Sequence, residues 1–284
     1  CDVDEPSKRP VRPDPFQLRQ PHVAEPATQN PFLSLPAPVS SNAQVSTTGP
    51  LISSKEEPVV KVPTSAGAHP ESEDDNACPD GMALVHGDAC PDARQVCADW
   101  MDPEDKKRCR RFEEKITCVG PKKHLRFCID KHEYAPGPGE KPLNDVSWTM
   151  SKEICESKGK RLCFESEWVF ACEGEEMRPY PTGLTRPSAL CNFDKDDLVD
   201  NRGKLRDFRQ PADANPECAS PFGVVNMVGN VDEWTRSTSP TGNKSIFKGG
   251  YWGPVRTRCR PTTRIHGESH VLYQEGFRCC SDLK

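Results

Sequence analysis

The chain has 284 residues and a formal net charge of −5, with 34% hydrophobic and 29% charged residues. This composition allows a core of modest size and gives no sign of the strongly basic surface that nucleic-acid-binding proteins carry. No stretch approaches the roughly 20 consecutive apolar residues of a membrane-spanning helix, so any membrane attachment would have to be through lipid.

Residues 1–77 predict a proline-rich, extended tether. They hold 13 of the 29 prolines and only Cys1 of the 15 cysteines. Proline removes backbone donors and favours polyproline II, and the segment has too few apolar residues to offset the cost of ordering it. Two apolar islands, residues 16–18 and 32–35, are candidate docking motifs, and chance is the alternative.

Cys1 differs from the other cysteines, since it stands alone ahead of the tether. We expect it to be the lipid-modified first residue of a mature bacterial lipoprotein. The protein would then be anchored in the cell envelope by lipid, facing the periplasm or the cell surface. The alternative is a fragment that begins at a cysteine by chance.

The other 14 cysteines all lie in the last three quarters of the chain. Their even number predicts disulfides formed in an oxidising compartment. Spacing alone does not decide how they pair. They stand at positions 78, 90, 97, 109, 118, 128, 155, 163, 172, 191, 218, 259, 279 and 280.

Residues 78–284 predict one folded domain of short elements. Alternation predicts strands over 81–87 and 125–134, and apolar spacing predicts helices near 103–115 and over 149–157 and 166–173. About 45 residues after 175 show little periodicity, so they need disulfides or a bound ion to hold them. The C-terminal part reads as strands over 245–251 and 276–280. Arg278, placed on a presumed buried strand, requires a carboxylate partner.

Six sequence blocks occur in a fixed order: DVSW (145–148), KRLCFESEW (160–168), YPTG (180–183), FGVVNMVGNVDEW (222–234), KGGYW (248–252) and GFRC (276–279). Together they resemble the formylglycine-generating enzyme family, the sulfatase-modifying-factor domain. The resemblance implies an α+β, C-type-lectin-like fold with low regular secondary structure. The cysteine-rich stretch 88–118 is not part of the family pattern and is interpreted as an insertion.

Enzymes of this family oxidise a substrate cysteine using copper and oxygen, and two cysteines five residues apart supply soft thiolates for Cu(I). Counted forward from the glycine pair of KGGYW, these positions fall on Pro254 and Cys259. Counted back from Arg264, they fall on Tyr251 and Arg256. The first thiolate is missing in both alignments, so copper is not expected, and Cys259 is only a weak catalytic candidate.

The resemblance also implies two disulfides and a calcium loop. Family members link the cysteines that match Cys155 and Cys279, and those that match Cys172 and Cys259. The calcium ligands would be the side chains of Asn226 and Glu233 and the carbonyls of Gly229 and Val231, an oxygen set that suits a hard cation. A second, weaker site would begin at Asn192 and Phe193, with Asp207 close to the position of its acidic ligand. The alternative is that Asn226 and Glu233 only stabilise the turn.

The scattered histidines His124, His132, His266 and His270 give little support for a zinc or iron site. Three functions therefore remain open at this stage. The first is a non-catalytic, lipid-anchored recognition or scaffold protein with partners in the cell envelope, an analogy with other lectin-like domains. The second is an active oxidase with a rearranged site that uses Cys259 alone or Cys279 and Cys280. The third is a calcium-dependent module that binds a ligand such as a glycan.

Overall fold

The computed structural model describes residues 77–239 and 241–283. The predictions for Cys1, for the islands 16–18 and 32–35 and for the tether up to residue 76 lie outside the described residues, and so stay predictions. None of the described helices is long and apolar enough to cross a membrane.

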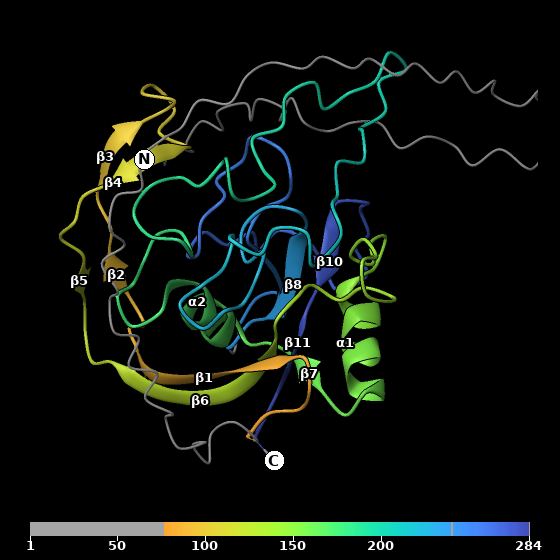
Figure 1. Cartoon of the computed structure of the whole chain (residues 1–284), viewed down its shortest axis with the longest axis horizontal. Coiled ribbons are helices and arrows are strands. Elements are labelled where there is room, and N and C mark those ends of the chain that lie inside the picture. Colours follow the sequence, from red (N-terminus) through yellow and green to blue (C-terminus); the bar gives the residue numbers. More distant parts are fainter. Residues whose placement is uncertain (1–76, 240, 284) are drawn as a thin grey trace, which may run out of the picture. The chain divides into compact units, whose positions relative to one another are not determined.

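Two small sheets form the centre of the domain (Figure 1). The first has the order β1-β6-β11-β7, in which β1 (Met82–Ala89) and β6 (Lys123–Asp130) form a long antiparallel pair. The second has the order β10-β8-β9, in which β10 runs parallel to β8 and β9 runs antiparallel to it. The other strands of these sheets are β7 (Arg161–Leu162), β8 (Asp232–Arg236), β9 (Ser245–Lys248), β10 (Glu275–Phe277) and β11 (Cys279–Ser281).

Two helices pack against these sheets. Helix α1 (Trp148–Ser157) begins after Ser147, whose hydroxyl accepts a hydrogen bond from the Met150 amide at 3.2 Å. Helix α2 (Glu165–Glu173) contacts strands of both sheets, and Glu167 in its first turn accepts the Phe164 amide at 2.8 Å. The predicted helices 149–157 and 166–173 and the strands at 81–87 and 125–134 are therefore confirmed, with ends shifted by a few residues.

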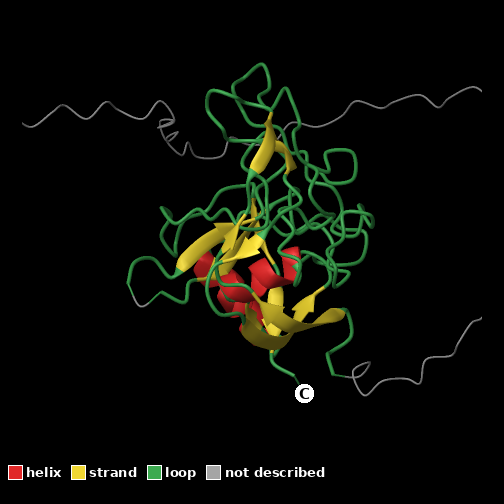
Figure 2. Ribbon diagram, turned by 90° about the vertical axis from the view of Figure 1, so that its left-hand side faces the viewer, coloured by secondary structure: helices red, strands yellow, loops and turns green. Residues whose placement is uncertain are grey.

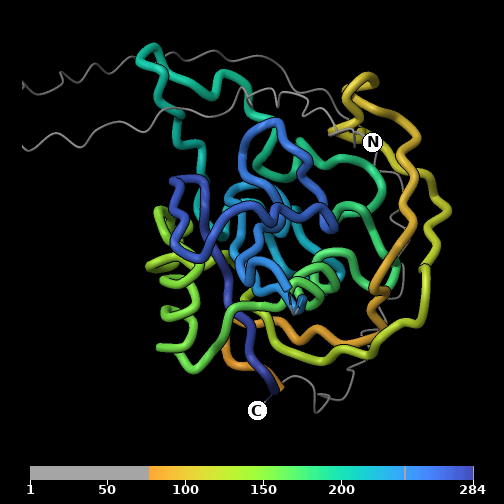
Figure 3. Tube along the Cα trace, turned by 180° about the vertical axis from the view of Figure 1, so that it is seen from behind, coloured from red at the N-terminus to blue at the C-terminus, as the bar shows by residue number. Residues whose placement is uncertain are grey.

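The cysteine-rich insertion forms an extended arm along one side of the domain (Figures 1 and 3). It contains two short ribbons, β2 (Ala93–Arg94) with β5 (Thr117–Cys118), and β3 (Cys97–Trp100) with β4 (Cys109–Phe112). The predicted helix near 103–115 is wrong. The disulfide Cys97–Cys109 and the pairing of β4 with β3 hold that segment extended, so these contacts override local helix propensity.

The predicted C-terminal strand over 276–280 is interrupted at Arg278. The residues before it form β10 in one sheet, and the residues after it form β11 in the other. Arg278 thus lies where the chain passes between the two sheets. The predicted strand over 245–251 ends at Lys248, because Gly249 and Gly250 adopt positive φ angles of 87° and 79°.

Most of the domain consists of loops, as Figure 2 shows. Three hydrophobic clusters lie beneath them, one around Trp168 and Cys172, one around Trp148 and Trp234, and a small one around Phe112 and Tyr180. The irregular stretch after residue 175 is held by the disulfide Cys191–Cys218. A bidentate ion pair between Arg186 and Asp194, with both distances 2.7 Å, adds to it. The expectation that this stretch needs cross-links is confirmed.

Candidate functional site

All 14 cysteines of the described part of the chain form disulfides. Cys259, the candidate copper ligand, is fully buried and bonded to Cys172 of α2. A disulfide sulfur offers no thiolate, so Cys259 is neither a metal ligand nor a nucleophile in this fold. The structure also contains the pair Cys155–Cys279, and both bridges are those implied by the family resemblance.

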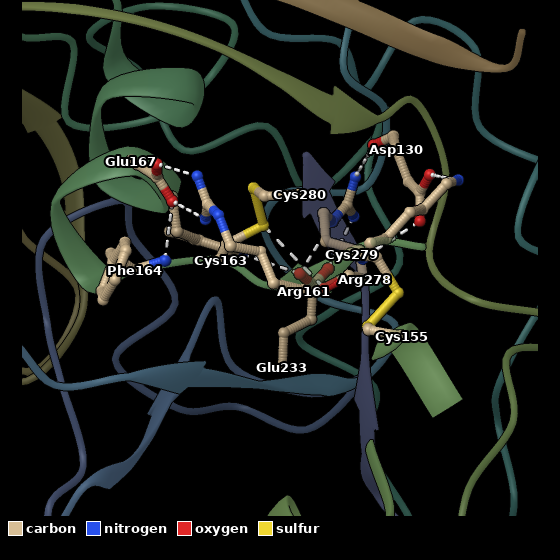
Figure 4. Close-up of a disulfide and its surroundings, with 12 residues drawn as sticks. Asp130, Cys155, Arg161, Cys163, Phe164, Glu167, Glu233, Arg278, Cys279 and Cys280 are labelled. Atoms are coloured by element: carbon tan, nitrogen blue, oxygen red, sulfur yellow. Dashed lines mark hydrogen bonds and ion pairs between the residues drawn. A yellow bond between two sulfur atoms is a disulfide. The ribbon is translucent and has the colours of Figure 1, made fainter. Parts of the chain in front are cut away.

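Cys279 and Cys280 do not form a metal site. Their side chains leave the strand in opposite directions, as neighbours on a strand do, and reach Cys155 and Cys163 respectively (Figure 4). The rearranged thiolate pair considered for an active oxidase is therefore wrong for this fold. The described part of the molecule holds no two free thiols from which a Cu(I) site could be built.

None of the positions that align with the family's copper ligands offers a free thiolate: Pro254 and Arg256 carry no sulfur, Tyr251 carries a phenol, and Cys259 is in a disulfide. The ring of Tyr251 lies edge-on to Trp252, with centroids 5.4 Å apart. Burial raises the pKa of Tyr251, and burial also raises the pKa of the neighbouring Asp232 carboxyl to about 7. The Trp252 Nε1 and the Tyr273 hydroxyl have no hydrogen-bond partner among the described residues. A phenol is a hard oxygen donor and suits Cu(I) poorly, so Tyr251 does not replace the missing thiolate.

His270 and Glu275 form a titratable pair next to Asp232, the strand partner of Glu275. Glu275 is 2% exposed, and burial raises the pKa of its carboxyl to about 8. His270 Nε2 lies 3.1 Å from Glu275 Oε1, and the ring of His270 stacks on that of His266 at 3.9 Å. His124 lies apart, beside Asp88. The described residues hold no group of three or more histidines, cysteines or carboxylates able to bind a metal.

The predicted calcium loop is buried, and its carboxylate is already engaged. Asn226 and Glu233 are each 1% exposed. The oxygens of Glu233 accept Arg278 Nη2 at 2.6 Å, Arg278 Nε at 2.7 Å and the Trp168 indole at 2.7 Å. Since a guanidinium already neutralises this carboxylate and would repel a second cation, the residues around Glu233 do not fit calcium.

The amide of Asn226 is also occupied. Its Nδ2 donates to Ala212 O at 3.1 Å, and its Oδ1 accepts from Asn215 at 3.2 Å. Gly229, with φ of 81°, lets the loop pass close to another segment, because a Cβ there would lie 2.5 Å from Asn192 O. The carbonyl of Val231 belongs to the same buried loop. These contacts match the alternative role, in which Asn226 and Glu233 stabilise the turn.

The second predicted calcium site lacks its acidic ligand. Asp207 accepts Arg209 Nη2 at 2.9 Å and Lys141 Nζ at 3.3 Å, so its carboxylate forms surface ion pairs. Asn192 donates to Phe208 O at 2.8 Å, and the ring of Phe193 packs beneath the Arg186 guanidinium at 4.7 Å. These contacts connect two loops, and neither of them provides a carboxylate for a metal ion.

Sequence reasoning missed Glu133, which lies beside the predicted calcium loop. It is 2% exposed and accepts Asn230 Nδ2 at 2.8 Å. Burial, followed by the charge of Glu233, raises the pKa of Glu133 well above its usual value. Its Oε1 has no hydrogen-bond partner among the described residues. The only sequence signal was a glutamate near the end of the strand predicted over 125–134.

Comparisons with known proteins identify the family of the chain. The model of the sulfatase-modifying factor enzyme 1-like domain matches residues 96–283. The inactive C-alpha-formylglycine-generating enzyme 2 of Mus musculus is 32% identical over 207 residues, covering 66% of this chain and 64% of that protein. Its Bos taurus counterpart is 31% identical, covering 51% and 54%.

Two further matches are more distant. Hercynine oxygenase of Mycolicibacterium smegmatis is 28% identical, covering 45% of this chain and 34% of that protein. The solved structure of PvdO from Pseudomonas aeruginosa aligns with a TM-score of 0.46 and 16% identity, over 71% of this chain and 94% of that one. The chain spans 54% and 64% of the length of the two inactive relatives. Since the family model covers well over half of its residues, the chain belongs to the formylglycine-generating enzyme family, with the C-type-lectin-like α+β fold of that domain.

Proposed function

We propose that this protein is a non-catalytic member of its family that uses the domain for protein interaction or scaffolding outside the cytoplasm. The observation that carries the proposal is that every described cysteine is bonded to another in a disulfide. A Cu(I) oxidase of this family needs two thiolates on one metal, and this fold offers neither. Relatives named as inactive enzymes make a non-catalytic role consistent with the family.

A free-thiol count on the full, non-reduced chain in denaturant tests the proposal. We expect at most one thiol, that of Cys1, together with no stoichiometric Cu(I) binding by the native protein. Incubation of a cysteine-containing peptide with the protein, copper and oxygen should yield no formylglycine. Two or more free thiols with a tight Cu(I) site, or turnover of the peptide, would favour the active oxidase instead.

The disulfides also indicate the compartment in which the protein works. Seven disulfides indicate an oxidising, extracytoplasmic environment. Lipid anchoring at Cys1 and partners in the cell envelope belong to the proposal. The N-terminal peptide should carry a lipid mass increment, and a Cys1→Ser variant should leave the membrane fraction. Recovery of the wild-type protein only in the soluble fraction would remove the anchor from the proposal.

Calcium-dependent glycan binding at the loop from Asn226 to Glu233 is not favoured. Both end residues are buried, and Gly229 closely contacts another backbone segment. A ligand outside the domain would not reach these groups without unfolding the loop.

A further inference from the structure

Two adjoining hollows lie beside α2, next to the buried Cys172–Cys259 disulfide, whose chain neighbours Glu173 and Arg260 line the first hollow. The first, about 460 Å³, is lined by α2, by the ends of β1 and β6 and by the segment that carries Arg260. The second, about 580 Å³, is lined mainly by residues 237–239 and 241–243. They share Glu165, Thr238 and Arg264, so together they form one continuous depression.

Covalent and ionic links hold the wall of the first hollow. Arg260 donates to the two oxygens of Glu173 at 2.6 and 2.7 Å and to Cys90 O at 2.8 Å. Cys90 is itself joined to Cys118 by a disulfide. These bonds tie α2 to the turn after β1, so the hollow is formed before any ligand arrives, which lowers the cost of binding.

The lining of the first hollow carries one more cation than carboxylates, within a protein whose net charge is −5. Its charged lining residues are the cations Lys123, Arg260 and Arg264 and the carboxylates Glu165 and Glu173. The exposed side chain of Lys123 makes no ion pair with any described residue. The side chain of Arg264 is 50% exposed and uses one nitrogen to pair with Glu165. Lys123 and Arg264 are therefore available to an anion.

The remaining lining supplies an apolar floor and hydroxyl groups. Leu125, Val169 and Phe170 form the apolar part of the first hollow. The second hollow is lined by Ser237, Ser239, Thr241 and Asn243. Apolar surface beside many hydroxyl and amide groups suits a sugar ring, which has apolar C–H faces and a polar rim.

We propose that these hollows bind a saccharide that bears a carboxylate, with the carboxylate at Lys123 and Arg264 and neighbouring sugar hydroxyls at Ser237, Ser239, Thr241 and Asn243. The site needs neither a free thiol at Cys259 nor calcium. Its failure would therefore leave the non-catalytic function untouched.

Calorimetric titration of the full, oxidised chain with trigalacturonic acid, an acidic trisaccharide, tests this proposal. The neutral trisaccharide maltotriose and the acidic peptide triglutamate serve as comparison ligands. We expect saturable binding of trigalacturonic acid and binding of both comparison ligands at least tenfold weaker. Lys123→Ala should weaken binding of the acidic sugar about fivefold, since one exposed charge contact is lost.

The matched control is Lys122→Ala, which removes an equally exposed neighbouring lysine that lines neither hollow. It should leave the affinity unchanged. Thr238→Trp, which fills the junction of the two hollows, should abolish binding without changing the unfolding midpoint by more than a few degrees. Equal affinity for maltotriose, equal affinity for triglutamate, equal effects of the two lysine variants, or no binding at millimolar sugar would each overturn the proposal.

Discussion

Arg278 and Glu233 form a bidentate ion pair that is fully buried between the two sheets. The guanidinium Nη2 and Nε lie 2.6 and 2.7 Å from the two carboxylate oxygens, and both side chains are at most 1% exposed (Figure 4). The sequence required a carboxylate for this arginine, and the structure identifies it. The pair occupies the point where the chain passes from β10 to β11, so it joins the sheets as well as neutralising a buried charge.

Breaking this pair should strongly destabilise the domain. We expect Glu233→Gln to lower the free energy of unfolding by about 3–5 kcal/mol, because it leaves Arg278 buried without a counter-charge. Urea unfolding of the oxidised protein measures the loss. The double variant Glu233→Gln/Arg278→Met should recover part of it. Arg110→Gln, which breaks an exposed pair with Asp99, is the control and should cost less than about 1 kcal/mol. An equal cost for the two single variants would contradict this account.

Calcium should not stabilise the domain through this loop. Since Glu233 is held by Arg278 and Trp168, we expect the same thermal midpoint in about 2 mM calcium as in chelator. A scan at several calcium concentrations provides the measurement. A saturable rise of the midpoint that is lost in Asn226→Ala would restore the calcium prediction.

Gly229 should tolerate no side chain. Gly229→Ala places a Cβ 2.5 Å from Asn192 O on backbone with φ of 81°, so we expect a loss of about 2–4 kcal/mol from strain and displaced packing. Gly203, with φ of 76° and no atom within 4 Å of its Cβ position, is the matched control. Gly203→Ala should cost about 1 kcal/mol, measured by the same urea titration. Similar costs for the two variants would show that the close approach at Gly229 is not tight.

Glu275 should make the domain less stable as pH rises. Burial raises the pKa of its carboxyl from 4.5 to about 8, so between these values the folded protein binds more protons than the unfolded chain. The free energy of unfolding contributed by this group therefore falls from pH 4.5 to 8. Glu275→Gln should flatten that part of the stability profile, and Glu268→Gln on the exposed surface should not. An unchanged slope in Glu275→Gln would refute the assignment.

Lys248 should act in the opposite direction and at higher pH. Burial lowers the pKa of its ammonium from 10.5 to about 7, so the unfolded chain binds more protons between these values. Its contribution to the free energy of unfolding therefore rises from pH 7 to 10.5. Lys248→Met should reduce the rise, and unfolding is measured at pH 9, 9.5 and 10, above the pKa of Glu275. The exposed Lys122→Met is the control. A rise of wild-type size in Lys248→Met would exclude this lysine as its source.

Local sequence was sufficient for the regular elements near the sheets. Alternation over 81–87 and three- to four-residue spacing over 149–157 reflect faces that are buried on one side, so pattern and structure agree. The cysteine-rich arm lacked such a signal. The helix predicted near 103–115 is absent, and Cys109–Phe112 of this segment forms β4, because Cys109 is bonded to Cys97 and β4 pairs with β3.

The sequence by itself determined the family, the two disulfides at Cys155 and Cys172, and the loss of the first copper thiolate, since each depends on residue identity along an ordered set of motifs. Only the tertiary structure decided the five other disulfides, the partner of Arg278, the burial of Glu133 and the hollows beside α2. These features join residues far apart in the chain, and long-range contact leaves no periodic trace in a single sequence.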